Sequence, residues 1–415
     1  MTTITQLAPV LQELLTHKAD ALARSSGFIR RQRKMSGSGF VQGLVLGYLG
    51  KPKATRRELH ASVLRSGVSI SETGLDKRFN AAGALFLRQV VEAALTEQIF
   101  AAAPAGLLQQ FTEVVLSDAT QVKQGRLAVK LATRLFMQSG RLQVSLESVR
   151  SHDARAQVCQ GQLTPGTLHL GDLGYFDLAQ FAQWNQQGVH WLSRYKTGVL
   201  LFGLDGQALD LSTCLSAHTP TCQPVRVGRT QALNAWLVAA PVSEAMYAKR
   251  LRQLNNEQRK RQRPLTARRY LARWTIYLTS IPNLPFDQAL ILARTRWQIE
   301  RLFKLWKSDG AHLATPPSTD PQRCACVLYA RFLAILITHW LHLTTTWHHV
   351  AASPKLVLST LRDHALLLQF AFAFPVTLPL VLEFLSTNTA SLPPRHSRAA
   401  DPPAFQLWRA FSFVP

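Results

Sequence analysis

The order of strand-like and helical segments in residues 105–198 is the feature that most restricts the fold of this chain. Apolar alternation predicts strands there, and a longer apolar period closed by a glycine predicts a helix. In chain order, the segments are strands at 111–122, 126–136, 141–149 and 167–176, a helix at 178–188 and a strand at 189–198. This order predicts an α/β fold with a mixed sheet covered by helices.

The remaining sequence changes texture several times along the chain. Its 415 residues exceed one ordinary core, so we expect several domains. They are a helical region at 1–104, the mixed α/β core at 105–198 and 274–347, a β-rich insertion with a basic segment at 199–273, and a C-terminal helical region and tail at 348–415.

The composition indicates a polyanionic partner. The formal net charge is +23, which makes nucleic acid the first candidate and an anionic membrane surface the second. The most apolar run, 326–343, contains Arg331, His339 and His342. A charge in the middle of a membrane span is costly, so we expect a buried helix and no membrane partner. The first residues lack the layout of a signal peptide, so we expect a cytoplasmic protein.

The cysteines give little support to a zinc or redox site. None of them forms a Cys-x-x-Cys pair, which is the usual sign of either. We therefore expect buried free thiols in a reducing cytoplasm at all five positions, which are Cys159, Cys214, Cys222, Cys324 and Cys326.

Residues 54–80 have the pattern of two short helices joined by a turn. Thr55 and Glu58 have capping-box spacing for the first helix, and Ser69 and Glu72 have it for the second. The apolar residues expected to line the two helices are Leu59, Val63 and Leu64, then Ile70, Leu75 and Phe79.

Such a helix pair resembles a helix-turn-helix, which places its second helix in the major groove of DNA. The second helix would then carry Lys77 and Arg78. The alternative is an ordinary helical hairpin with a solvated charged face. The high net charge favours DNA binding.

Two aspartates follow apolar strand segments. Asp118 comes after Val-Val-Leu-Ser at the apparent end of one strand, and Asp172 comes after Leu-His-Leu-Gly on another. Strand ends that feed loops are where α/β sheets place reactive groups. Each aspartate alone could instead cap a turn. Asp153, in a polar connection, and Asp177, beyond the strand end, are weaker candidates.

A third acid stands among basic residues in 294–307, which we expect to lie in one helix over 286–310. A helical wheel places Ile299, Leu302 and Trp306 on an apolar face. A second face holds Arg296, Glu300, Phe303 and Lys307, with Lys304 nearby. The alternative for Glu300 is an exposed salt bridge, worth only about 0.3–0.5 kcal/mol.

Taken together, the three acids suggest a divalent-metal nuclease site. Phosphoryl transfer on nucleic acid needs hard oxygen ligands for Mg²⁺, which carboxylates supply. Two metal ions can stabilise the attacking and the leaving oxygen together. Neighbouring arginines and lysines would hold the phosphates.

Three short motifs, Ser-Asp-Ala-Thr (117–120), Gly-Asp-Leu-Gly-Tyr-Phe (171–176) and residues 293–307, resemble the catalytic motifs of DDE transposases. The resemblance is to the insertion-sequence-four family, with its Tyr-x2-Arg-x3-Glu-x6-Lys signature. Arg296, Glu300 and Lys307 match that spacing, whereas Ala293 stands at the tyrosine position. In that family the tyrosine supports contacts with DNA phosphates, a role for which Arg294 is the nearby substitute.

The resemblance implies an RNase H-like core with a β-rich insertion between the second and third acids. Asp118, Asp172 and Glu300 would hold two Mg²⁺ ions, for which Mn²⁺ can substitute. Arg296 and Lys307, helped by Lys304, would position phosphates. Trp274 occupies the place of a base-flipping tryptophan, with a core tryptophan at a strand start as the equal alternative.

The implied function is transposition of a bacterial insertion sequence in the cytoplasm, at the nucleoid. The implied partners are double-stranded DNA, as element ends and as target, and a second copy of the chain in a synaptic homodimer. Two alternatives stay open. One is a catalytically impaired, transposase-derived DNA-binding protein, and the other is an RNase H-like nuclease that cleaves without joining strands.

Overall fold

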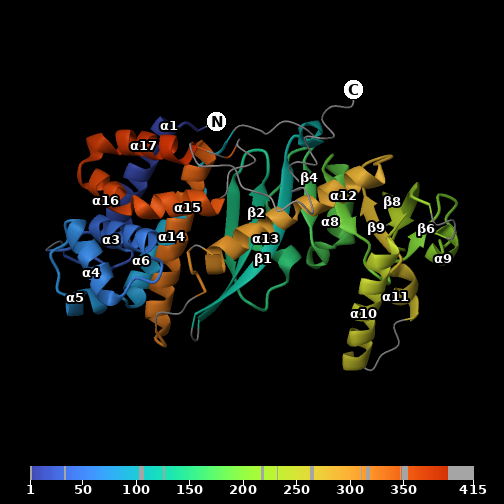
Figure 1. Cartoon of the computed structure of the whole chain (residues 1–415), viewed down its shortest axis with the longest axis horizontal. Coiled ribbons are helices and arrows are strands. Elements are labelled where there is room, and N and C mark those ends of the chain that lie inside the picture. The colour runs from blue at the N-terminus through green and yellow to red at the C-terminus, as the bar shows by residue number, and fades with distance from the viewer. Residues whose placement is uncertain are drawn as a thin grey trace. The chain divides into compact units, whose positions relative to one another are not determined.

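The structure is a computed structural model in which the sheet order and the helices can be followed along the chain (Figure 1). The residues that it describes are 2–31, 34–101, 107–124, 127–215, 219–230, 232–261, 266–309, 311–314, 318–345, 347 and 354–390. The tail from residue 391 onward, expected from the sequence to be loosely ordered, lies outside these residues.

The chain divides into two compact units. The first comprises Met1–Pro104, Ala119–Ser151 and Gln298–Pro402. The second comprises Ala105–Asp118, His152–Trp297 and Pro403–Pro415. Both units are therefore built from segments that lie far apart in the sequence.

The first unit is mainly helical. Its N-terminal helices are α1 (Ile4–Glu13), η1 (Leu14–Lys18), α2 (Ala19–Ser25), α3 (Gly37–Gly50), α4 (Arg56–Arg65), α5 (Glu72–Asp76) and α6 (Ala81–Thr96). Its C-terminal helices are α13 (Trp297–Lys304), η5 (Leu305–Asp309), α14 (Pro321–Thr345), α15 (Pro354–Asp363), α16 (Ala365–Ala373), η6 (Pro375–Thr377) and α17 (Leu378–Ala390). N-terminal and C-terminal helices pack on each other, since α14 contacts α3 and α6 while α17 contacts α1.

Helix α14 is the core of this unit. It buries residues around its whole circumference, as expected for a helix that is enclosed by others. It is also long and apolar enough to cross a membrane, but 94% of its most apolar window is buried inside the protein. The bent pair Lys355–Asp363 and Ala365–Ala373 passes the same test of length and composition. The expectation of a buried helix at 326–343 is confirmed.

A nine-stranded mixed sheet has the order β3-β2-β1-β4-β5-β9-β8-β7-β6. Its strands are β1 (Val114–Gln124), β2 (Leu127–Phe136), β3 (Leu142–Glu147), β4 (Leu168–Gly171), β5 (His190–Arg194), β6 (Leu201–Phe202), β7 (Thr221–Val227), β8 (Leu233–Pro241) and β9 (Trp274–Thr279). The neighbours β1, β4 and β5 are parallel, whereas β2 with β3 and the run from β5 to β6 are antiparallel. The predicted mixed α/β class is confirmed.

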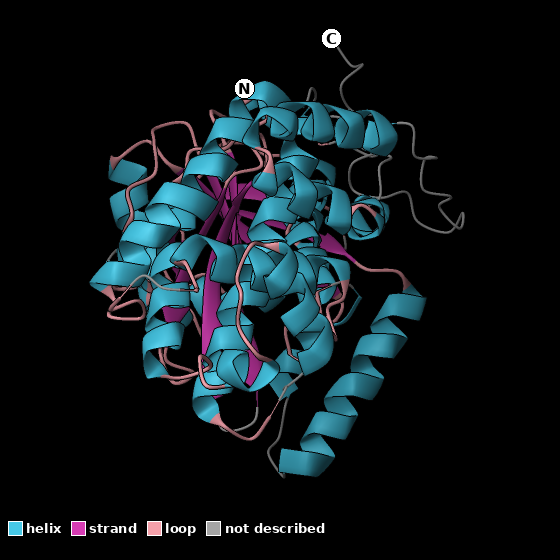
Figure 2. Ribbon diagram, turned by 90° about the vertical axis from the view of Figure 1, so that its left-hand side faces the viewer, coloured by secondary structure: helices cyan, strands magenta, loops and turns pink. Residues whose placement is uncertain are grey.

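Figure 2 colours helices cyan and strands magenta. Along the chain, helices of the second unit alternate with its strands. They are η2 (Leu107–Gln110), η3 (Asp153–Arg155), α7 (Gln157–Gln160), η4 (Leu173–Tyr175), α8 (Leu178–Gln186), α9 (Leu211–Cys214), α10 (Glu244–Arg261), α11 (Thr266–Leu271) and α12 (Phe286–Thr295). Helix α8 ends as predicted, because Gly188 adopts a left-handed φ of 68° that glycine tolerates without strain.

The segment 199–273 is the predicted β-rich insertion only in its first part. Strands β6, β7 and β8 extend the sheet beyond β9. The basic part that follows forms the helices α10 and α11.

The expectation for the cysteines is wrong at two positions. All five are free thiols, and Cys159, Cys324 and Cys326 are buried. Cys214 is half-buried and Cys222 is exposed. Alternation explains Cys222, because it lies on β7, where successive side chains point to opposite faces.

Candidate active site

Asp118 and Asp172 lie side by side at one end of a parallel strand pair. Strand β1 pairs with β4, and the last matched pair is Ser117 with Gly171. Asp118 and Asp172 are the next residue on each strand. The two aspartates therefore leave the ladder from neighbouring strands at the same end of the pair.

The sequence suggested that Asp118 ends its strand, but the strand continues beyond it. Strand β1 continues to Gln124, because its other edge is paired with β2. What ends at Asp118 is the pairing with β4. The aspartate therefore stands where the ladder with β4 opens, within a strand that continues beyond it.

Asp172 follows β4 directly, as predicted. It is the N-cap of η4, and its Oδ1 accepts a hydrogen bond of 2.8 Å from the backbone N–H of Gly174. This is the only hydrogen bond to the Asp172 carboxylate within the described part of the chain. The capping alternative is therefore correct for Oδ1, while Oδ2 stays available for a ligand.

Asp118 is held by an arginine from the third motif. Arg296 Nη1 donates to Asp118 Oδ2 at 3.3 Å, and the two side chains are only 20% and 15% exposed. Arg296 is the C-cap of α12 and keeps right-handed helical backbone angles, but it lies in a one-residue turn that separates α12 from α13. The expectation of one unbroken helix over 286–310 is wrong at this residue.

Asp153 is a site residue that the sequence interpretation set aside. A side chain on Gly174 would meet Asp172 Oδ1 at 2.9 Å and Asp153 Oδ2 at 3.1 Å, so the two carboxylates flank this glycine. Only a residue without Cβ fits between them. Asp153 lies in a polar connection without apolar periodicity, so the sequence contains no signal that would place it near Asp172.

Tyr175 brings an unused hydroxyl close to the same acids. Its side chain is 5% exposed, and its hydroxyl has no hydrogen-bond partner within the described residues. Burial raises the pKa of the Tyr175 phenol, and the nearby Cys159, Asp153, Asp118 and Asp172 raise it further. The phenol therefore stays neutral and can only donate or accept a hydrogen bond.

Two neighbouring polar residues have structural roles. His169 is buried on β4, and its Nε2 shares a hydrogen bond of 2.8 Å with Ser117 Oγ, as expected for a histidine on a sheet face. Asp177 caps α8, because its Oδ1 accepts from the N–H groups of Ala179 and Gln180 at 2.9 and 3.2 Å. Asp177 is therefore a cap and no rival to Asp172.

Glu300 lies on α13, in the first unit, and is half-buried. The wheel placed Phe303 on the same face, but Phe303 is buried together with Ile299 and Trp306. Leu302, expected in the core, is only half-buried. Both residues lie within α13, where about 100° per residue puts Phe303 about 40° from Ile299 and about 60° from Glu300, so regular helix geometry already favours its burial.

The cations expected around Glu300 are accessible to different degrees. Arg294 on α12 and Lys304 on α13 are exposed. Lys307 is half-buried and lies in the π-helix η5, so its position relative to Glu300 no longer follows from a period of 3.6 residues. Ala293, at the position of the family tyrosine, is half-buried on α12.

Trp274 lies in the core, at the start of β9. Its side chain is only 3% exposed. Arg250 Nη1 donates to the Trp274 carbonyl at 2.6 Å, which fixes the backbone there. The structure thus agrees with the core alternative, and contact with a flipped base would require the ring to leave this position.

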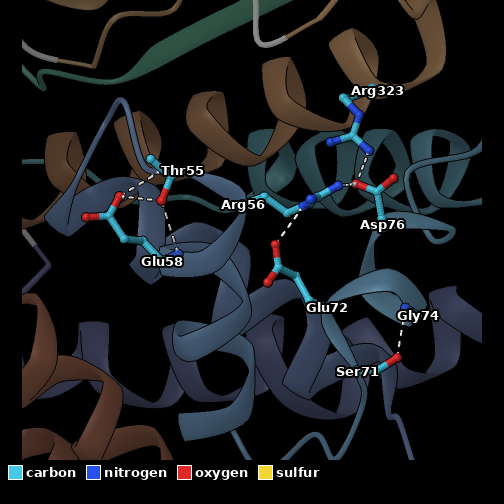
Figure 3. Close-up of polar contacts among 8 residues, drawn as sticks. All are labelled: Thr55, Arg56, Glu58, Ser71, Glu72, Gly74, Asp76 and Arg323. Atoms are coloured by element: carbon cyan, nitrogen blue, oxygen red, sulfur yellow. Dashed lines mark hydrogen bonds and ion pairs between the residues drawn. The ribbon is translucent and has the colours of Figure 1, made fainter.

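The segment 54–80 contains one of its two predicted capping boxes (Figure 3). Thr55 and Glu58 satisfy each other's backbone N–H groups at the start of α4. The second box is wrong, because Ser71 caps α5, by accepting from Gly74. Ser69 instead uses its backbone N–H to bond to Lys34.

The predicted second helix of this pair is a single turn. It ends at Asp76, so Lys77 and Arg78 lie in the turn before α6 and not on a recognition helix. Arg56 pairs with Glu72 at 2.7 Å and approaches Asp76 at 3.7 Å, while Arg323 also contacts Asp76 (Figure 3). Leu64, expected in the apolar face, is 45% exposed.

The chemistry of the paired aspartates suits a hard cation. Mg²⁺ is commonly bound by one or two carboxylates together with waters and substrate phosphates, which Asp118 and Asp172 can match. Among the described residues, no group of three or more His, Cys, Asp or Glu side chains is arranged to hold a metal ion. Convergence of Glu300 with the two aspartates stays a prediction.

Comparison with known families supports the class of protein that these residues predicted. Residues 142–337 match the family described as Transposase DDE domain. The matched stretch contains Asp172 and Glu300 and begins after Asp118. The chain therefore carries a domain of this class over that stretch.

Named transposases are similar over most of the chain. The chain is 26% identical over 386 residues to the transposase for insertion sequence element IS231F of Bacillus thuringiensis subsp. israelensis, a match that covers 80% of this chain and 79% of the relative. The IS231E transposase of Bacillus thuringiensis subsp. finitimus is 25% identical over 79% of this chain and 77% of its own length. The IS1151 transposase of Clostridium perfringens is 23% identical over 41% of each chain. These matches and the DDE domain support a DDE transposase.

Proposed function

We propose that this protein is the transposase of a bacterial insertion sequence. It binds the terminal inverted repeats of its element, cleaves the DNA and transfers the strands to a target. The observation that carries this proposal is the pair Asp118 and Asp172 on neighbouring parallel strands, beside Arg296, in a chain similar to named insertion-sequence transposases. The finer assignment is to the insertion-sequence-four family, with an RNase H-like core.

The proposed cofactor is a pair of Mg²⁺ ions, with Mn²⁺ as a working substitute. When bound, the metal activates the attacking oxygen and stabilises the leaving oxygen of the phosphodiester. Asp118 and Asp172 would hold it from the sheet, and Glu300 would complete the set from α13. Asp118 is oriented by Arg296, and Asp172 by the Gly174 N–H.

Basic side chains of the third motif would position the DNA. Arg296 already binds a carboxylate oxygen, and its guanidinium can present other N–H groups to a phosphate. Arg294 and Lys304 are exposed and would contact phosphates more loosely, and the half-buried Lys307 would add a further contact. Tyr175 lies close to the acids, where its buried hydroxyl can donate to a bound phosphate or water.

The helical region 1–104 is the proposed reader of the element ends. Lys77 is exposed and Arg78 is half-buried in the turn between α5 and α6, so both can reach a phosphate from that turn. A contact from a turn fixes register on the duplex but carries no base readout. We therefore assign these two residues to backbone binding.

A second copy of the chain is the proposed protein partner, at the nucleoid of a bacterial cytoplasm. Helices α16 and α17 expose large apolar side chains, which are Leu366, Phe370, Phe374, Val376, Leu380 and Phe384. Residues 363–390 contain no lysine or arginine, in a chain of net charge +23. This face is therefore where two basic copies can meet without like-charge repulsion. Light scattering should show a dimer that Leu366→Ser with Phe370→Ser weakens.

The experiment that tests the function uses a labelled duplex with one element end and a supercoiled target plasmid. With Mg²⁺ present, the purified protein should nick the end and then join it to the plasmid. Cleavage without joining would favour the RNase H-like nuclease.

Absence of both reactions, with end binding intact, would favour an impaired DNA-binding descendant of a transposase. The feature that supports this second candidate is Ala293, which stands where the family has tyrosine. Ala293→Tyr is the matched variant, and on that account it would restore or increase cleavage.

A further inference from the structure

The most basic segment of the chain forms its own helical hairpin. Residues 244–273 contain ten lysines and arginines against two acids, so about a third of the net charge of +23 lies in this segment. The segment comprises α10 and the shorter α11, which Figure 1 shows beside each other, leading away from β8 and β9. We call its described residues, 244–261 and 266–273, the basic arm.

Helix α10 contributes little to a core, because its apolar residues Tyr247, Leu251 and Leu254 are only half-buried. None of the side chains described on it, from Glu244 to Gln258, is buried. A surface helix normally buries an apolar stripe, and isolated helices are marginal without such packing. The basic arm therefore retains this length for a reason other than the stability of the fold.

The base of the basic arm is nevertheless firmly attached. Arg250 donates from Nη1 to the carbonyls of Ala272 and Trp274 and from Nη2 to Thr275 Oγ1, at 3.3, 2.6 and 2.9 Å. These bonds join the first part of α10 to the start of β9. The arm thus leaves the sheet in a fixed direction.

Two further contacts hold the helices together. Arg273 pairs with Glu244 at 2.8 Å across the base. Arg269 on α11 donates to Asn255 Oδ1 at 3.0 Å and to Gln258 Oε1 at 3.2 Å on α10. Three arginines of the basic arm are therefore structural, and the remaining cations are not needed for these contacts.

Lys249 and Arg252 are the cations that the arm presents to solvent. Both are exposed, and neither has an ion pair or side-chain hydrogen bond within the described residues. Their spacing of three puts them on one side of α10.

We propose that the basic arm binds the sugar-phosphate backbone of duplex DNA without reading its sequence. The proposal rests on the proposed function in so far as that function makes DNA the substrate. Lysine and arginine contacts with phosphates supply sequence-independent affinity. Helix α10 is about 27 Å long at 1.5 Å per residue, which is enough to follow a duplex for most of one turn.

An anionic membrane is the weaker partner for this surface. A helix that lies on a membrane needs an exposed apolar face opposite its cations. On the described part of α10, the only large exposed apolar side chain is Met246. The arm has the charge for a membrane but lacks the apolar stripe.

The test compares two variants that lose the same charge. Lys249→Gln with Arg252→Gln removes two arm cations, and Arg226→Gln with Arg229→Gln removes two exposed cations elsewhere in the second unit. Binding to an unrelated 30-base-pair duplex is followed by fluorescence anisotropy, without divalent metal, between about 50 and 300 mM KCl. Circular dichroism confirms that each variant is folded.

The arm variant should lower the slope of log Kobs against log salt by about 1.8, since each lost phosphate contact contributes about 0.9. The control variant should keep the wild-type slope. The exchange Lys249→Arg with Arg252→Lys keeps both charges and should therefore keep the wild-type slope. If the double variant misfolds, Lys249→Gln and Arg252→Gln are measured one at a time, and each should lower the slope by about 0.9.

Three results would overturn the proposal. The arm variant could bind with the wild-type salt slope. The control variant could instead lose as much of the salt slope as the arm variant, which would show that net charge alone is the cause. The arm variant could also lose binding to vesicles of phosphatidylserine and phosphatidylcholine while it keeps DNA binding. Failure of the proposed function would be seen separately, as absent cleavage of an element end, because this assay needs no cleavage.

Discussion

Asp172 and Asp177 offer the sharpest separation of catalytic from structural carboxylates. They lie five residues apart, and each caps a helical turn through Oδ1. Substitution by asparagine keeps the capping oxygen, since asparagine and aspartate cap about equally well. It removes the negative charge that a metal ion needs. Asp172→Asn should therefore fold normally and lose cleavage, whereas Asp177→Asn should keep both.

The magnitudes follow from the contacts that each residue makes. Asp177 accepts two backbone N–H bonds, so Asp177→Ala should cost about 1 kcal/mol of unfolding free energy. Cleavage by Asp177→Ala should stay near wild type. A metal ion supplies several kcal/mol of transition-state stabilisation, so loss of a metal ligand at Asp172 should slow cleavage by about 100-fold or more.

The assay combines urea unfolding with single-turnover cleavage of a labelled element end in Mg²⁺. The account requires opposite outcomes at the two positions. Asp172→Asn should lose cleavage and keep its stability, whereas Asp177→Ala should lose stability and keep cleavage. Cleavage by Asp172→Asn at the wild-type rate would refute the assignment of Asp172. Loss of cleavage in a folded Asp177→Asn would show that the two roles have been exchanged.

Two further predictions concern the packing of α14. Burial lowers the pKa of His339 to about 4 and that of His342 to about 3, so both stay neutral when folded. In the unfolded chain both histidines bind protons below about pH 6.5, so the free energy of unfolding should fall by a few kcal/mol between pH 6.5 and 4. His339→Gln should make this pH dependence less steep when the free energy of unfolding is measured by urea titration at each pH. Gly140→Ala should destabilise by about 1–3 kcal/mol by thermal melting, because its φ is 68° and the new Cβ would lie 2.2 Å from Leu343 Cδ2. An unchanged pH slope or melting temperature would contradict these two accounts.

The sheet could be predicted where a strand has a strong local pattern. The segments that contain β1 to β5 were recognised because apolar alternation and turn residues are local signals. Their order in the sheet was not accessible, since pairing such as that of β8 with β9 depends on contacts distant in sequence. Asp118 was placed at the apparent end of its strand, whereas pairing with β2 carries β1 on to Gln124.

The helices show where a wheel drawn from sequence fails. Phe303 was grouped with Glu300, although about 100° per residue puts it nearer to Ile299, and it is buried with Ile299 in α13. A wheel also assumes one uniform helix, and it gives no valid direction for Lys307, which lies in the π-helix that begins at Leu305. The capping box at Thr55 was predictable because it depends only on neighbouring residues. The second N-cap was predicted at Ser69, but it is Ser71, because α5 is a short helix that begins at Glu72.

The candidate site was predictable in its acids but not in its surroundings. Asp118 and Asp172 could be found because both follow apolar strands, and the register of β1 with β4 brings them together. Asp153 and Tyr175 could not be found from the sequence, because their positions near the two aspartates depend on how η3 packs against η4. No periodic signal in the sequence encodes that packing.

The most direct test of the central claim is the effect of Asp118→Asn on cleavage of an element end in Mg²⁺, measured beside binding of the same end. Asparagine keeps an oxygen that can accept from Arg296, so the variant should fold and bind the end within about twofold of wild type. Cleavage should fall by about 1,000-fold, which corresponds to about 4 kcal/mol of lost transition-state stabilisation. Cleavage that survives in the pure, folded variant would contradict the claim that Asp118 and Asp172 form the catalytic pair.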